Sequence, residues 1–448
     1  MSLPGLRLDS SRWRYSPWPL AVVPACVALL AGLGLLVDVD SKYALGGAIA
    51  LFAIGLWAVD PIFPVVLTVP ATLFVERLGG GGTNLSVSDF ILFFGTLAAL
   101  PAVRWSEATW LRRLLIVDVV YQALTVPVVI YHPTKVGIIE WFHDFFLVGG
   151  SFVVGWVLAD RDRIRGALGS YLIGATALSL ATMGYYAAHH FHAGGLPLRM
   201  QKNYIGDMLA FAIVAAHVNP EWARLRGRWV RWAKYICALG MLSSGSRQAI
   251  VGVLVALLVV TLRGGQLARR SKAMLLALAP LAAVAYLTVT KELASHNRFN
   301  SVHQRLSWYH QAISLWHHYV WLGAGLRFFL TGQFPLNIQP PNAEMEMLAS
   351  GGIVGLVALV ILGALSLRRL WSLPKAVGTL GLALVLCRLT QGQLDIFWVA
   401  AQNSLPWMLA GMSLGAADRL VRADPRAGVP AITEPGARGR GLALHGVP

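Results

Sequence analysis

The chain alternates between long apolar runs and short polar intervals. Its apolar runs lie at 20–37, 43–59, 61–75, 87–103, 113–131, 145–159, 167–188, 204–218, 230–243, 248–263, 273–290, 346–367, 376–390 and 396–416. A straight transmembrane helix needs about 20 apolar residues, and several runs are shorter, so the pattern predicts about 12 to 14 membrane helices. The run 61–75 contains three prolines (Pro61, Pro64 and Pro70), so we expect it to be broken or re-entrant.

Basic residues fall in every second interval between the runs. They are Arg7, Arg12 and Arg14; Arg104, Arg112 and Arg113; Arg161, Arg163 and Arg165; Arg224, Arg226, Arg228, Arg231 and Lys234; Arg263, Arg269, Arg270 and Lys272; Arg368, Arg369 and Lys375; and Arg419, Arg422 and Arg426. The positive-inside rule places these intervals and both termini in the cytoplasm. The intervals 38–42, 76–86, 132–144, 189–203, 244–247, 291–345 and 391–395 then face outward.

Composition supports the same class of protein. Apolar residues make up 56% of the 448 residues and charged residues 13%, which a soluble protein of this size would not show. The net charge of +16 is explained by the basic cytoplasmic intervals, so no nucleic-acid partner is expected.

The cysteines Cys26, Cys237 and Cys387 stand apart, which excludes a disulfide framework, a zinc ribbon and an iron–sulfur site. We expect no cleavable signal peptide, because residues 1–19 are polar and contain arginines.

One transmembrane domain therefore accounts for most of the chain. It spans residues 20–419, after a cytoplasmic segment at 1–19 and before a Gly/Pro/Arg-rich tail at 420–448 that we expect to be disordered. The longest polar interval, 291–345, forms a large outward loop. A loop of this length between membrane helices is usually functional.

The large loop contains an amphipathic helix over residues 302–320. Val302, Leu306, Tyr309, Ile313, Trp316 and Val320 form one apolar stripe, and His303, Gln304, Ser307, His310, Gln311, Ser314 and His317 lie opposite. We expect this helix to rest on the outer membrane interface, with Arg305 bordering the stripe where it can reach a lipid phosphate. The histidines are either solvated or catalytic. No HExxH or comparable spacing is present, so the sequence predicts no metal site.

Two further basic groups stand at outward helix starts. Arg199 and Lys202 precede an apolar helix whose N-terminal end attracts phosphate, although Asn203 beside them can be read as a simple helix cap. Arg247 follows a serine-rich turn in which Ser246 caps the next helix. An arginine there either snorkels to the interface or binds an anion, and we favour the anion.

Carboxylates begin the helix that follows the large loop. Asn342, Glu344 and Glu346 precede or open this helix. Glutamates in a first turn favour the helix dipole, and they are also able to serve as a general base. Arg388 and Asp395, near the outer ends of the last two helices, are either an ion pair or part of the access route for an acceptor.

Four short motifs resemble those of the bacterial O-antigen ligase and O-antigen polymerase family. Residues 201–206 (QKNYIG) are similar to its "N-x-x-G" helix start, and residues 245–249 (GSRQA) to its "SRG" turn. Residues 305–308 (RLSW) through 321–328 (WLGAGLRF) are similar to its "R…W…G-x-G-x-x-F" stretch. Residues 342–355 are similar to its "HN-x-x-L…G-x-x-G" helix. Residues 1–190 resemble the family only in hydropathy.

The resemblance implies an all-α, GT-C-like transmembrane bundle that catalyses glycosyl transfer without a metal or other cofactor and with inversion. It implies transfer of a glycan from a polyprenyl phosphate or pyrophosphate carrier to a hydroxyl of a glycan or glycolipid acceptor, on the outer face of the bacterial inner membrane. The family's pyrophosphate-binding arginines match Arg247 and Arg305, and we add Arg199, Lys202, Arg327 and Asn342 as phosphate-binding candidates. Besides the donor and the acceptor, membrane lipids are the expected partners.

This chain departs from the family pattern at one position. The histidine that activates the acceptor is expected directly before Asn342, where this chain has Pro341. Proline cannot act as a base, so Glu344, Glu346, His303 and His310 are the candidates, in that order. Because Pro341 replaces this histidine, the sequence does not decide whether the protein is a ligase, a polymerase or an inactive scaffold. A flippase for lipid-linked oligosaccharides is the alternative from another class, but the chain shows neither inverted repeats nor ionisable residues on both halves.

Overall fold

The computed structural model describes residues 55, 58, 60–74, 85–189, 200–225, 227–264, 266–295, 301–331 and 339–423. The predicted helix 20–37, most of the run 43–59, Arg199, and the segments at 1–19 and 424–448 lie outside these residues. Residues 1–63 and 64–448 form two units, and the arrangement given below is that of the second unit.

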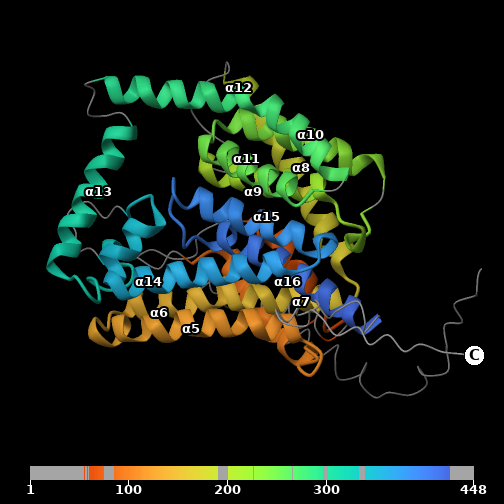
Figure 1. Ribbon diagram of the computed structural model, residues 1–448, viewed down its shortest axis with the longest axis horizontal. Coiled ribbons are helices and arrows are strands. Elements are labelled where there is room, and N and C mark those ends of the chain that lie inside the picture. The colour runs from red at the N-terminus through yellow and green to blue at the C-terminus, as the bar shows by residue number, and fades with distance from the viewer. Residues whose placement is uncertain are drawn as a thin grey trace, which may run out of the picture. The chain divides into compact units, whose positions relative to one another are not determined.

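Every regular element of the described residues is a helix, as the hydropathy pattern predicts (Figure 1). The α-helices are α3 (Phe63–Ala71), α4 (Val87–Ala99), α5 (Thr109–Tyr131), α6 (Lys135–Phe145), α7 (Ser151–Asp160), α8 (Ile164–Ala188), α9 (Lys202–Val218), α10 (Arg228–Ser244), α11 (Arg247–Leu262), α12 (Gln266–Ala294), α13 (Ser301–His318), α14 (Ala343–Ser372), α15 (Lys375–Gln391) and α16 (Ala400–Ala423). The expected all-α membrane bundle is thus confirmed.

Four stretches of the described chain are long and apolar enough to cross a membrane. They are Thr109–Tyr131, Lys135–Asp160, Ile164–Ala188 and Ala343–Ser372. Val87–Ala102 and Arg247–Leu262 are shorter apolar helices. The protein is therefore membrane-embedded. The predicted total of about 12 to 14 helices stays a prediction, because most of residues 1–59 lie outside the described part.

The prediction that residues 132–144 form a loop is wrong for most of their length, because α6 occupies Lys135–Phe145. The Thr134 hydroxyl accepts a hydrogen bond from the Gly137 amide at 3.0 Å and caps α6, which continues through a π-helical turn at Phe146–Gly150 into α7. In the sequence, the charged residues of α6 indicate an exposed loop. In the structure Glu140, His143 and Asp144 are buried against other elements, so charged residues at these positions do not mark an exposed segment.

Helices α7 and α16 pack closely through glycines. A Cβ atom on Gly155 would lie 2.9 Å from the Cα atom of Gly411, and one on Gly411 would lie 2.5 Å from the Phe152 carbonyl oxygen. Gly411 and Gly415 are four residues apart, the spacing of small residues that allows membrane helices to approach closely. All ten residues of α7 are buried as a result, in large part by α16.

Helix α14 contains a break that the preceding loop fills. Gly352 has a φ of 63°, which only glycine adopts readily, and the helix resumes after it. The loop residue Gly323 approaches so closely that a Cβ on Gly352 would lie 2.6 Å from the Gly323 amide nitrogen. Backbone hydrogen bonds from Ala324 to Ala349 and from Gly325 to Ser350, both 2.9 Å, bind the loop to the break. Gly323 of the 321–328 motif and Gly352 of the 342–355 motif therefore pack directly against each other, and we call this contact the Gly323–Gly352 clasp.

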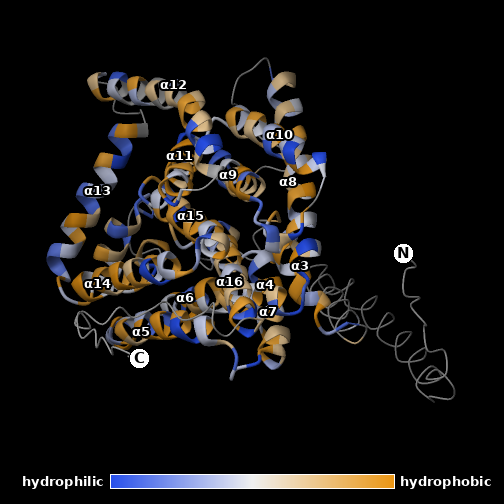
Figure 2. Ribbon diagram, turned by 45° about the vertical axis from the view of Figure 1, so that its right-hand side comes forward, coloured by the Kyte–Doolittle hydropathy of each residue, from blue (hydrophilic) through white to orange (hydrophobic). Residues whose placement is uncertain are grey.

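Helix α13 packs on α14. The residues that make this contact coincide only in part with the predicted apolar stripe. Ala312 is buried with Ala349 and Phe329. Tyr309, a stripe residue, donates a hydrogen bond from its hydroxyl to the Pro341 carbonyl oxygen at 3.4 Å, whereas the stripe residue Leu306 is exposed. Figure 2 shows hydrophilic and hydrophobic residues alternating along α13. Its predicted place on the membrane interface remains a prediction.

Candidate functional site

The segment 392–399 between α15 and α16 joins several elements that carry predicted site residues, and we call it the 392–399 loop. Arg305 of α13 donates a hydrogen bond to the Leu394 carbonyl oxygen. The side-chain amide of Gln393 donates to Glu344 Oε1 at 2.6 Å. Arg305 and Glu344 are therefore held by adjacent residues of one loop. The Ala343 amide also donates to the Gly392 carbonyl oxygen at 2.8 Å, which fixes the start of α14 to the same loop.

Asn342 positions the start of α14. Its Oδ1 accepts the Met345 amide at 2.9 Å as the helix cap, and its Nδ2 donates to the Gln393 carbonyl oxygen at 3.1 Å. Glu344 then lies in the first turn, half-buried, and its Oε2 atom has no hydrogen-bond partner among the described residues. Gln393 anchors Oε1, whereas the Oε2 atom is buried and keeps the capacity to take a proton from a hydroxyl group that reaches it.

Two basic residues stand at adjoining helix starts. Helix α9 begins at Lys202, so Asn203 lies inside the first turn and does not cap the helix. Ser246 caps α11, as predicted, by accepting the Ala249 amide at 3.4 Å. The two starts touch, because a Cβ on Gly206 would lie 2.7 Å from Ser246 Oγ. The exposed Lys202 and the half-buried Arg247 thus stand near two helix N-termini, which favour anions.

A buried polar cluster surrounds Arg327, and we call it the Arg327 cluster (Glu140, His143, Arg327, Gln339 and Glu346). Arg327 Nη2 lies 2.6 Å from Glu140 Oε1 and also donates to the Trp398 carbonyl oxygen. Arg327 Nη1 donates to Gln339 Oε1 at 2.9 Å, and Gln339 in turn donates to Glu346. Burial by itself lowers the pKa of Arg327, but the carboxylates of Glu140 and Glu346 outweigh burial and hold that pKa above its usual value. Arg327 is therefore charged and fully engaged in the fold.

A second buried cluster surrounds Asp207 on α9. Asp207 Oδ2 accepts from Gln248 Nε2 at 2.9 Å and from Gln402 Nε2 at 2.6 Å, and it lies 3.6 Å from Arg388 Nη1. Gln248 also contacts Asp395 Oδ2 at 2.9 Å. The ion pair of Arg388 is thus with Asp207. The other amino group, Arg388 Nη2, donates to the Ile396 and Phe397 carbonyl oxygens at 2.7 and 2.5 Å and so anchors the 392–399 loop.

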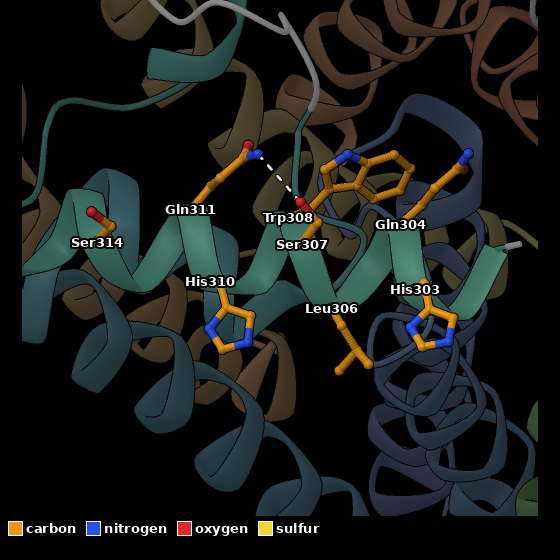
Figure 3. A pocket seen from close by; sticks show the side chains of 8 residues that line it. All are labelled: His303, Gln304, Leu306, Ser307, Trp308, His310, Gln311 and Ser314. Atoms are coloured by element: carbon orange, nitrogen blue, oxygen red, sulfur yellow. Dashed lines mark hydrogen bonds between the residues drawn. The ribbon is translucent and has the colours of Figure 1, made fainter. Parts of the chain in front are cut away.

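The candidate histidines lie on α13, beside a hollow of about 840 Å³ (Figure 3). In this view His303 and His310 point to one side of the helix, together with Leu306. Gln304, Trp308 and Gln311 point to the other side. His310 is exposed, and a ring nitrogen of His303, Nε2, lies 3.0 Å from the Ser295 carbonyl oxygen.

Most of the buried polar residues of the two clusters are not among the predicted site residues. Glu140, His143, Asp207, Gln248, Gln339 and Gln402 make close polar contacts there. A usable signal was present at Asp207, a carboxylate inside the apolar run 204–218, because ionisable groups at membrane depth are costly and usually have a role.

Comparison with known families identifies the central part of the chain. The family model described as O-Antigen ligase matches residues 232–360, from within α10 to within α14. Arg247, Arg305, Arg327, Asn342 and Glu344 all fall inside this stretch, whereas the 201–206 motif precedes it. No curated protein matches the chain. The resemblance drawn from the motifs is thereby confirmed.

Proposed function

We propose a specific glycosyl-transfer reaction for this chain, and the match of residues 232–360 to the O-antigen ligase family supports it. The protein transfers a glycan from a polyprenyl phosphate or pyrophosphate carrier to an acceptor hydroxyl on the outer face of the bacterial inner membrane. The observation that carries the proposal is the attachment of Arg305 and Glu344 to adjacent residues of the 392–399 loop. A cation and a carboxylate held on one loop supply the two charges that the transfer needs.

The basic residues act on the phosphate end of the donor. The bond between the anomeric carbon and the phosphate oxygen breaks, and the departing phosphate gains negative charge. Guanidinium groups and helix N-termini that are fixed in advance stabilise this charge without reorganisation. Arg305, Arg247 and Lys202 take this role, together with Arg199, which lies outside the described residues. We assign Arg327 a supporting role, because Glu140, Gln339 and Trp398 already occupy its guanidinium group.

Glu344 acts on the acceptor. The acceptor oxygen attacks the anomeric carbon from the side opposite the phosphate, which inverts the configuration, and its proton passes to Glu344 Oε2. Glu346 is less suited, because it is only 4% exposed, whereas Glu344 is half-buried. His303 and His310 are the remaining candidates for the base. The donor arrives already activated, so no nucleotide-sugar site, metal or other cofactor is required for this step.

The test is the fate of the lipid-linked glycan in cells that lack the protein. Wild type, Arg247→Ala and Arg305→Ala are restored in parallel, with Arg368→Ala as the matched control, an exposed arginine at the other end of α14. We expect the intermediate to accumulate on the outer face and only wild type and Arg368→Ala to clear it.

Two outcomes contradict the proposal. Clearance by both Arg247→Ala and Arg305→Ala, at normal protein levels, removes the phosphate-binding assignment. Accumulation on the cytoplasmic face indicates the alternative function, a flippase for lipid-linked oligosaccharides.

A further inference from the structure

Three potential metal ligands share one face of α6. Glu140, His143 and Asp144 stand at positions i, i+3 and i+4, the spacing that places side chains on the same side of a helix. One donor atom from each lies within 4.8 Å of the others. The three residues are 8%, 7% and 2% exposed, so solvent contributes little to them.

The surroundings carry more negative than positive charge. Asp89, Glu140 and Asp144 are buried carboxylates on or beside this face of α6, whereas Arg327 and a protonated His143 supply at most two positive charges next to them. The hydroxyl of Tyr121 donates to Asp144 Oδ2 at 3.2 Å, and Asp144 Oδ1 has no hydrogen-bond partner among the described residues. A buried carboxylate without a counter-charge is costly, so the cluster needs either protons or a cation.

The geometry around His143 favours a cation. Asp89 Oδ1 lies 3.0 Å from His143 Nε2, and Asp89 is itself fixed because its Oδ2 accepts the Ser86 amide at 2.7 Å and the Ser86 hydroxyl at 2.9 Å. A carboxylate behind one imidazole nitrogen is the usual partner of a metal-binding histidine, since it directs the lone pair of the other nitrogen to the ion. Here the other nitrogen, Nδ1, lies 3.4 Å from Glu140 Oε2.

Arg327 leaves this position open. It contacts the opposite oxygen of Glu140, Oε1, at 2.6 Å. Coordination through Oε2 therefore keeps the ion pair in place, with the guanidinium group and the ion on different oxygens of the same carboxylate.

We propose that Glu140 Oε2, His143 Nδ1 and Asp144 Oδ1 bind a divalent transition-metal ion. One imidazole and two carboxylates suit Zn²⁺ or Mn²⁺, whereas Mg²⁺ and Ca²⁺ prefer oxygen ligands alone. The ion offsets the excess negative charge. It also ties α6 to Asp89 of α4 and, through Glu140, to the Arg327 segment. Its role is structural and lies outside the proposed glycosyl transfer, which uses different residues.

Metal content of the purified protein tests the proposal. The full chain in detergent is stripped with a chelator, dialysed separately against Zn²⁺, Mn²⁺ and Mg²⁺, gel-filtered, and analysed by mass spectrometry of the elements. We expect about one Zn²⁺ or Mn²⁺ ion per chain, no retained Mg²⁺, and a higher unfolding temperature only when the ion is bound. Asp144→Asn and His143→Gln should lose the ion. Asp207→Asn, which alters a buried carboxylate of the other cluster, should retain it.

Substitution with Co²⁺ gives a second measurement that does not depend on how the variants fold. Visible absorption bands of wild-type protein loaded with Co²⁺ report nitrogen and oxygen ligands directly. Wild-type protein that binds none of these ions, or binding that is undiminished in both Asp144→Asn and His143→Gln, overturns the proposal. The first of these results shows that Glu140 and Asp144 share protons instead.

Discussion

Arg327 and Glu140, which lie far apart in the sequence, form a buried ion pair with 2.6 Å between Nη2 and Oε1. The pair joins the loop that precedes α14 to the middle of a helix from the first half of the chain. Removing one partner of a buried pair leaves the other charge without compensation. We expect Glu140→Gln to lower the free energy of unfolding by about 3–5 kcal/mol, measured by thermal unfolding in detergent.

The control for this prediction is Glu107→Gln. The side chain of Glu107 is 37% exposed and pairs with Arg104 and Arg422, so its loss should cost far less. The double variant Glu140→Gln/Arg327→Leu should recover part of the lost stability, because it removes the unpaired charge as well. Equal effects of Glu140→Gln and Glu107→Gln would show that the Arg327 ion pair does not stabilise the fold.

The Gly323–Gly352 clasp makes a second prediction. Gly352→Ala places a side chain at a φ of 63° and against the backbone of the 320–325 segment. We expect a loss of about 1–3 kcal/mol in the free energy of unfolding. The matched control is Gly184→Ala in α8, where a Cβ meets nothing within 4 Å and the helix gains about 0.5–1 kcal/mol. A neutral Gly352→Ala would contradict the break in α14.

The third prediction concerns the contact between α7 and α16. Gly411→Ala brings a methyl group within 2.5 Å of the Phe152 carbonyl oxygen, so the two helices must separate. We expect a loss of about 1–3 kcal/mol. Gly363→Ala in α14 is the control, because its Cβ would lie 3.8 Å from Leu389, an ordinary contact. Thermal unfolding of the two variants side by side is the measurement, and equal midpoints would count against the close packing.

Glu344 makes the fourth prediction, which concerns activity. Glu344→Gln retains the size and one hydrogen-bonding oxygen of the side chain but cannot accept the proton. We expect the turnover of purified protein to fall by about 10²–10⁴-fold, with the affinity for the lipid-linked donor unchanged. Glu344→Asp should recover part of the rate. Full turnover in Glu344→Gln would transfer the role of base to Glu346, His303 or His310.

The sequence predicts the helical bundle well, because apolar runs near the thickness of a bilayer have few other structures available. It also predicts that Arg247, Arg305 and Glu344 act together. Arg305 and Glu344 attach to one loop, and the joint action of the three residues stays a prediction. It does not predict the buried clusters. Glu140 was read as part of a loop because its counter-charge, Arg327, comes from a segment far along the chain, and local pattern does not encode that partner. Asp207 and Arg388 are likewise far apart in the sequence, so the local pattern does not predict that they form an ion pair.

The packing of α7 against α16 has a consequence for biogenesis. Helix α7 leaves the ribosome early, whereas α16 is made after every other described helix. Until then α7 packs on α4, α5 and α8 but lacks the helix that makes its most extensive contact. The face of α7 that carries Gly155 is therefore covered only after synthesis of α16, the last of the described helices.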